Sequence, residues 1–227
     1  MSVLVIAAHP DDETLGCGGT IARLSAEKEP VHILILGEGI RSRSEKDDGS
    51  ETGRIDALQT HAQKAAGILN AADIAFESFP DNRFDSVPLL DIVKCIEHHI
   101  EMHRPHTLFT HFGGDLNIDH SVTFRAALTA ARPMTGTSIK NIFAFETLSA
   151  TDWAFDRINS GFSPTYFVNI EDHIEQKIKA MQAYTGEIRT FPHPRSEEAI
   201  DALARYRGST AGFNFCEAFC TIRQLNP

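Results

Sequence analysis

The chain has 227 residues, a formal net charge of −10 and 42% hydrophobic residues. This length suits one large α/β domain with a full core. The acidic charge, without a basic stripe to neutralise phosphates, argues against nucleic acid and anionic membranes as partners. The longest apolar runs have strand length and the N-terminus lacks a basic signal-peptide start, so we expect no integral membrane segment and a cytoplasmic protein.

Strand-like and helix-like segments alternate over residues 1–150. Continuous apolar runs predict buried strands, and the segments between them have helical periodicity. The predicted strands are 2–7, 31–37, 73–79, 106–111 and 141–148, and the predicted helices are 14–28 (with Thr14 as N-cap), 53–70, 89–103 and 120–132. This order predicts a Rossmann-like α/β fold, with a mostly parallel sheet flanked by helices on both faces. The polar segment 38–52 is interpreted as a surface loop or an active-site lid.

The pattern loosens after residue 150. Strands are predicted at 165–170 and 217–224, with helices at 171–188 and after "PHPRSEE". Because there is no linker or internal repeat, residues 151–227 are interpreted as a C-terminal α/β cap region. It would extend the 1–150 core within one domain, 1–227.

Polar side chains follow four of the predicted strands. The carboxyl ends of parallel strands meet at one rim of a sheet, where ligands bind, so these side chains are expected to converge. They are His9, Asp11, Asp12 and Glu13 after the first strand, Glu38 after the second, Asp81 after the third, and His111, Asp115, Asn117, Asp119 and His120 after the fourth.

Two imidazoles and one carboxylate form a common catalytic zinc set. His9 and Asp12 could bind from one tight loop and His120 from a helix start, which predicts one Zn²⁺ per chain. Asp11, beside a ligand but off the metal, is the natural general base. The alternative, that "HPDD" is only a turn whose carboxylates cap a helix, is weakened by the later "NIDH". The glycines of "GCGGT" lack dinucleotide-loop spacing and instead predict close helix packing.

"AHPDDE" and the later "DLNIDH" resemble motifs of the PIG-L/LmbE-like zinc N-deacetylase family, a resemblance that covers roughly residues 1–135. It implies zinc ligands at His9, Asp12 and His120 and a general base at Asp11. It further implies that Glu38, Arg54 and Asp81 surround a bound sugar. Since the family includes monomers and trimer-based hexamers, the resemblance also allows a homo-oligomer.

The second motif departs from the family, because many relatives carry H-P-D-H where this chain has "NIDH". Asn117 can donate a hydrogen bond to an oxyanion but cannot supply a proton. The leaving amine would then be protonated by Asp11 or by a group such as His111. Asp119 is expected to hold His120 in the required tautomer.

These expectations predict a zinc-dependent hydrolase that removes the acetyl group from an N-acetylated amino sugar or glycoconjugate, in surface-glycan or sugar-thiol biosynthesis. Two alternatives stay open. One is a metal-dependent amidase for a larger acyl group. The other is a non-catalytic metal-binding or ligand-binding module, ranked last because all four core residues are present. Elsewhere, His98 and His99 lie in polar helical surroundings and are expected to be solvated.

Overall fold

The computed structural model describes residues 1–40, 51–157 and 161–226. Their backbone forms a seven-stranded sheet with the strand order β3-β2-β1-β4-β5-β7-β6. The strands are β1 (Val3–Ala7), β2 (Val31–Gly37), β3 (Asp73–Phe79), β4 (Thr107–His111), β5 (Asn141–Phe145), β6 (Tyr166–Asn169) and β7 (Cys216–Gln224). Strands β1 to β5 are parallel, while β7 runs antiparallel to both β5 and β6. The predicted mostly parallel sheet is confirmed.

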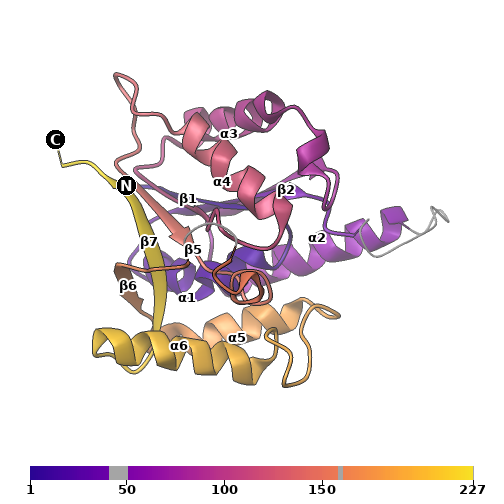
Figure 1. Cartoon of the computed structure of the whole chain (residues 1–227), viewed down its shortest axis with the longest axis vertical. Coiled ribbons are helices and arrows are strands. Elements are labelled where there is room, and N and C mark those ends of the chain that lie inside the picture. The colour runs from indigo at the N-terminus through magenta and orange to yellow at the C-terminus, as the bar shows by residue number, and fades with distance from the viewer. Residues whose placement is uncertain (41–50, 158–160, 227) are drawn as a thin grey trace.

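Helices cover both faces of the sheet (Figure 1). They are α1 (Asp12–Ala26), α2 (Glu51–Ile68), α3 (Leu89–His103), α4 (Ile118–Ala130), α5 (Ile174–Ala183) and α6 (Glu197–Ala211), with short 3₁₀ turns η2 (Phe84–Ser86), η3 (Asp152–Ala154) and η4 (Glu171–His173). Side chains of β1 alternate between two cores: Val3 and Val5 pack with α1, α2, α5 and α6, and Leu4 and Ile6 pack with α3 and α4. This alternation explains why the strand is apolar throughout.

Several predicted bounds differ from the structure by a few residues, most notably at the start of α1. Helix α1 begins at Asp12 with Asp11 as its N-cap, so Thr14 lies inside the helix. The expected C-terminal cap region instead supplies β6 and β7 to the same sheet. Of the predicted loop or lid, positions 41–50 lie outside the described residues.

Helix α1 is interrupted at Cys17, whose φ of −147° and ψ of 23° are not helical. A Cβ on Gly19 would lie 2.8 Å from Ile170, so the close packing predicted for the glycines is confirmed at this point. Across the interruption, Nζ of Lys177 donates to the carbonyl of Leu15, and the carboxylate of Glu217 accepts the backbone N–H groups of Gly19 and Thr20. The kink therefore has an identifiable cause, namely side chains inserted into the helical hydrogen-bond ladder.

The neighbouring strands β1 and β4 mark the point where the chain reverses its direction across the sheet. From β1 it continues outward through β2 to β3, and from β4 outward through β5 in the opposite direction. Ligands of open α/β sheets bind outside the carboxyl ends of such a strand pair. Among the described residues, no helix is long and apolar enough to span a membrane.

Candidate metal centre and active site

The loop after β1 brings two of the predicted ligands together. Asp11 adopts a left-handed conformation (φ 101°), which turns the chain from the strand into α1. One carboxylate oxygen of Asp12, Oδ2, accepts the backbone N–H of His9 at 2.9 Å. The side chain of Asp12 is thereby fixed against the turn that also carries His9.

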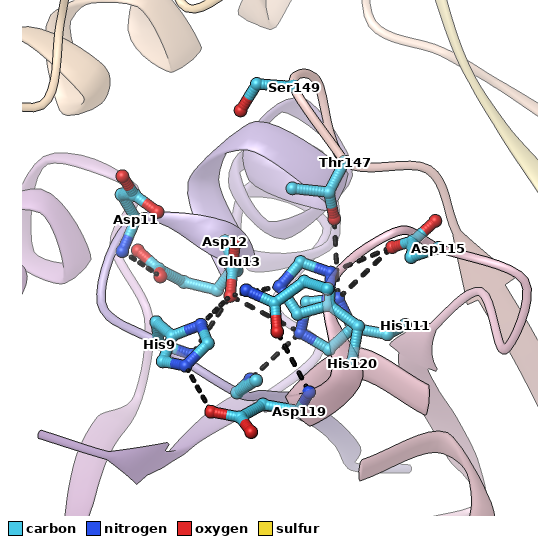
Figure 2. A network of polar contacts seen from close by, with 12 residues as sticks. His9, Asp11, Asp12, Glu13, His111, Asp115, Asp119, His120, Thr147 and Ser149 are labelled. Carbon is cyan, nitrogen blue, oxygen red and sulfur yellow. Dashed lines mark hydrogen bonds and ion pairs between the residues drawn. The ribbon is translucent and has the colours of Figure 1, made fainter. Parts of the chain in front are cut away.

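His9, Asp12 and His120 converge on one point (Figure 2). Asp12 Oδ2 lies 3.3 Å from Nδ1 of His9 and 3.2 Å from Nε2 of His120. Two ligands bound tetrahedrally to zinc at its usual bond lengths lie about 3.3 Å apart. The three side chains therefore fit a zinc ion, and Asp12 and His120, 1% and 2% exposed, are shielded from water.

Both histidines of this group, His9 and His120, are oriented by a second carboxylate. Nδ1 of His120 lies 2.9 Å from Oδ2 of Asp115, and Nε2 of His9 lies 2.9 Å from Oδ2 of Asp119. Each carboxylate holds the proton on the ring nitrogen that faces away from Asp12, which leaves the other nitrogen as a ligand. The expectation that Asp119 orients His120 was wrong, because Asp115 does so.

Asp119 is also held from the other side of the site. Its Oδ2 accepts the backbone N–H of Asn82 at 2.6 Å, and its Oδ1 accepts that of Phe84 at 2.9 Å. Asp81 places Oδ1 3.2 Å from Nε2 of His9. The segment after β3 thus supports His9 in two ways. Asp81 contacts the ring directly, and two backbone N–H groups hold Asp119 against it.

The charges in this cluster favour a bound cation. Burial by itself lowers the pKa of His9, but hydrogen bonds to Asp119 and Asp12 outweigh it and raise the pKa to about 10. Burial also opposes ionisation of Asp12, yet the charge of His120 holds the pKa of Asp12 well below its ordinary value. Raised pKa values at His9 and His120 mean that these imidazoles hold protons more readily among the carboxylates. A divalent ion can displace these protons, as in other metal sites.

Asp11 lies beside the ligands but is held by a different group. Its Oδ2 accepts a hydrogen bond from Nη1 of Arg195 at 2.7 Å. The same nitrogen lies 3.3 Å from Oε2 of Glu187, and Nε of Arg195 donates to Ser149. Burial raises the pKa of Asp11 well above its ordinary value, the Arg195 charge lowers it, and the carboxylates of Asp12 and Glu187 raise it further. Arg195 is a site residue that spacing could not reveal, because it lies 184 positions from Asp11.

The side chain of Glu13 stabilises the left-handed backbone conformation of Asp11. Its Oε2 accepts the Asp11 N–H at 3.1 Å, and its Oε1 accepts the hydroxyl of Tyr184 at 2.6 Å. Residue 184 belongs to the C-terminal third, so that region shapes the active-site turn directly.

The family model described as GlcNAc-PI de-N-acetylase, PIG-L, matches residues 4–131. The protein belongs to the PIG-L family.

Similar proteins include other members with deacetylase names. The chain is 26% identical to the uncharacterized deacetylase YaiS of Escherichia coli over 80% of this chain and 89% of YaiS. It is 24% identical to the diacetylchitobiose deacetylase of Thermococcus kodakarensis over 95% of this chain and 80% of that enzyme. GalB, the 4-carboxy-2-hydroxymuconate hydratase of Pseudomonas putida, has the same fold, with a TM-score of 0.79 and 21% sequence identity. The superposition covers all of this chain and 98% of GalB. The PIG-L fold therefore does not by itself determine the reaction.

The residues of the "NIDH" motif take different positions in this PIG-L domain. Asn117 is the N-cap of α4, and its Oδ1 accepts the N–H of Asp119, which leaves the amide nitrogen to donate.

His111, at the end of β4, is fully buried, and its Nε2 accepts the N–H of Ala8 at 2.9 Å. Burial, and then the charge of His120, lower the pKa of His111 well below its ordinary value. His111 is therefore a buried imidazole whose Nε2 already accepts a backbone N–H, and its role as proton donor stays a prediction.

The three residues that the resemblance assigned to the sugar lie at different distances from the metal ligands. Asp81 is buried against His9. Glu38 follows β2 with its backbone N–H bonded to Phe79. Arg54 is exposed on α2, where it lines a cavity of about 250 Å³ together with Glu187. Asp81 thus lies in the group of side chains that could hold a metal, while Arg54 lines a cavity beside it.

Proposed function

We propose that this protein is a zinc-dependent N-deacetylase that hydrolyses the acetamide of an N-acetylated amino sugar or glycoconjugate. The observation that carries the proposal is the convergence of His9, Asp12 and His120, with Asp11 buried beside them and held by Arg195. A three-ligand set with an adjacent carboxylate off the metal is suited to metal-assisted hydrolysis. The named diacetylchitobiose deacetylase among its relatives supports an acetylated sugar as the substrate.

When bound, zinc supplies a Lewis acid that makes water more acidic and polarises the substrate carbonyl. The carboxylate of Asp11 takes a proton from the attacking water as the new C–O bond forms. The amide nitrogen of Asn117 donates a hydrogen bond to the developing oxyanion. Asp11 then delivers its proton to the leaving nitrogen as the C–N bond breaks, which gives acetate and a free amine.

Arg195 serves this mechanism by holding one oxygen of Asp11, so that the other is presented in a fixed direction. The rest of the sugar would extend from Asp81 past Glu38 towards the cavity lined by Arg54. Because Glu187 both lines that cavity and contacts Arg195, sugar binding and the position of the base are joined through one ion pair.

Metal content and acetate release, measured together on the same preparations, test this proposal. Wild type should hold about one zinc at this site and release acetate from an N-acetyl sugar. His120→Ala should lose that zinc. Asp11→Asn should keep it, yet lose about 10²- to 10⁴-fold in turnover, the usual contribution of a general base.

The substrate panel separates the acetyl group from larger acyl groups. N-acetylglucosamine and diacetylchitobiose are compared with N-butyrylglucosamine, which differs from the first only in the acyl chain. Faster hydrolysis of the butyryl amide would favour the amidase alternative. Near-normal turnover by Asp11→Asn would refute the assignment of the base, and a wild-type protein without metal would refute the mechanism.

A further inference from the structure

A second group of metal-binding side chains lies between α3 and the open edge of the sheet. Cys95, His99 and His103 are spaced four residues apart on α3, so they form one stripe along the helix. Asp73 and Glu77 lie on the same face of β3, the edge strand of the sheet. His32 of β2 pairs in register with Asp73. The expectation that His99 is solvated was wrong, since it is only 6% exposed.

His32, Asp73 and His103 form the tighter end of this stripe. Nδ1 of His32 lies 2.8 Å from Oδ2 of Asp73. The imidazole rings of His32 and His103 are stacked with their centroids 3.9 Å apart. One ligand atom from each of the three residues lies within 4.8 Å of the others. The set has two imidazoles and one carboxylate, the same donor types as His9, Asp12 and His120.

Packing alone does not account for these side chains. Leu34 and Leu36 share a strand face with His32, and both are fully buried in the core below α3 and α4. A histidine therefore interrupts an otherwise apolar strand face. His99 lies one turn from His103, with ring centroids 6.0 Å apart, and its Nδ1 has no hydrogen-bond partner among the described residues. A buried ring nitrogen without a partner is costly, and a nearby cation is one way to satisfy it.

The group is separate from the catalytic centre. His32 is the second residue of β2, Asp73 is the first residue of β3, and His103 ends α3, so all three lie at the amino ends of the strands. The catalytic ligands lie at the carboxyl ends. His32 and Gly37, which lies at that rim, are five residue steps apart in β2, a distance of about 17 Å along the strand.

We propose that His32, Asp73 and His103 form a second transition-metal site, with Zn²⁺ as the ion that suits it. Imidazole nitrogen and a carboxylate favour zinc over magnesium or calcium, which prefer all-oxygen sites. Binding would require the two stacked rings to turn, so that one nitrogen of each could share the ion with the carboxylate of Asp73. His99, one turn earlier on α3 with its ring centroid 6.0 Å from that of His103, is a further nitrogen donor in this region. The bound ion would join the end of α3 to β2 and to the edge strand β3, which makes its role structural.

The test uses the full-length protein loaded with excess Zn²⁺, passed through metal-free gel filtration and analysed for metal. Wild type should retain two ions per chain, while His32→Ala and His103→Ala should each retain one. His98→Ala is the matched control, because His98 is an exposed histidine of the same helix outside the group, and it should retain two. Asp73→Asn, a nearly isosteric change at an exposed position, guards against loss of folding and should also retain one.

Two further measurements make the outcome decisive. His103→Ala should keep the deacetylation rate of wild type, whereas His120→Ala should lose the other ion, so failure of either site is distinguishable from failure of the other. The Co²⁺-substituted protein should show no thiolate charge-transfer band. Retention by wild type of a single ion that His120→Ala loses, or retention of two ions by His103→Ala, would overturn the proposal. So would a thiolate band that disappears in Cys95→Ser, because the ligands would then be Glu77, Cys95 and His99.

Discussion

The ion pair that bridges the break in α1 allows a stability prediction to be worked from the structure. In a regular helix the N–H of Gly19 would donate to the carbonyl of Leu15. Here Nζ of Lys177 donates to that carbonyl at 2.8 Å, and Oε1 of Glu217 accepts the Gly19 N–H at 2.9 Å. Glu217 also accepts the N–H of Thr20 at 2.7 Å, and it pairs with Lys177 at 2.6 Å. The pair therefore makes three hydrogen bonds to the backbone of α1 around the break, in addition to its own ion pair.

Lys177→Met removes one charge from this buried arrangement. The Lys177 and Glu217 side chains are 6% and 4% exposed, so the carboxylate cannot turn to water when its partner is lost. Removal of one partner of a buried ion pair costs about 3–5 kcal/mol. For a chain of this size, 1 kcal/mol corresponds to roughly 2–4 °C in Tm, so the expected fall is roughly 6–20 °C.

Urea unfolding followed by circular dichroism measures this loss, and the same chain offers a matched control. Lys179→Met makes the same substitution two residues further along α5, where the side chain is 66% exposed and its nearest carboxylate is 3.9 Å away. That variant should change the free energy of unfolding by less than about 0.5 kcal/mol. The double variant Lys177→Met/Glu217→Gln should lose less than the sum of its single variants, because each residue removes the other's penalty. If Lys177→Met were destabilised no more than Lys179→Met, the account of the helix break would be wrong.

Three other predictions concern the active site and the packing of α1. Arg195→Met should lower kcat at least about tenfold with zinc content unchanged, and Arg195→Lys should recover part of it; loss of zinc instead would show a structural role. Asp115→Asn should weaken zinc binding about 10- to 100-fold in a competition assay with a chelator, because the ligand histidine of α4 loses its orienting carboxylate. Gly16→Ala should destabilise the protein by about 1–3 kcal/mol in chemical denaturation, since its Cβ would enter the ring of Phe145. Gly67→Ala, in α2 with open space around its Cβ position, should instead be neutral or stabilise it by up to about 1 kcal/mol.

The sequence predicted helices and strands correctly where the local pattern of apolar residues matches their burial in the folded protein. The runs that became β2 and β3 were predicted with their observed ends, because an apolar stretch between polar turns has only one buried arrangement. The start of α1 was misplaced because Thr14 is a good N-cap type, whereas the actual cap is a left-handed Asp11 stabilised by Glu13 from within the helix. The position of β7 between β5 and β6 depends on contacts across the chain and leaves no local signal.

The convergence of His9, Asp12 and His120 could be predicted for a similar reason, whereas the carboxylates that contact the two histidines could not. His9 and Asp12 share one turn, and the end of a predicted strand places His120 at the same rim. To choose between Asp115 and Asp119 as the partner of His120, one must know where each side chain points, and their positions in the sequence do not show this. Adjacent residues of a helix point about 100° apart, so Asp119 faces away from the ring that follows it.

That direction determines how the site is supported. Asp119 turns to His9 and to the backbone after β3, while Asp115, from the loop before α4, reaches Nδ1 of His120. Asp119 therefore orients His9 and not His120, which follows it in the sequence. Asp115 orients His120 instead. Arg195 is likewise a partner that spacing does not reveal, and its contact with Asp11 joins the C-terminal third to the catalytic turn. The contacts of Asp119 with His9 and of Arg195 with Asp11 join residues 110 and 184 positions apart, so they form only once the sheet has assembled. The geometry around Asp11 should therefore be lost whenever the packing of the C-terminal third against α1 is lost.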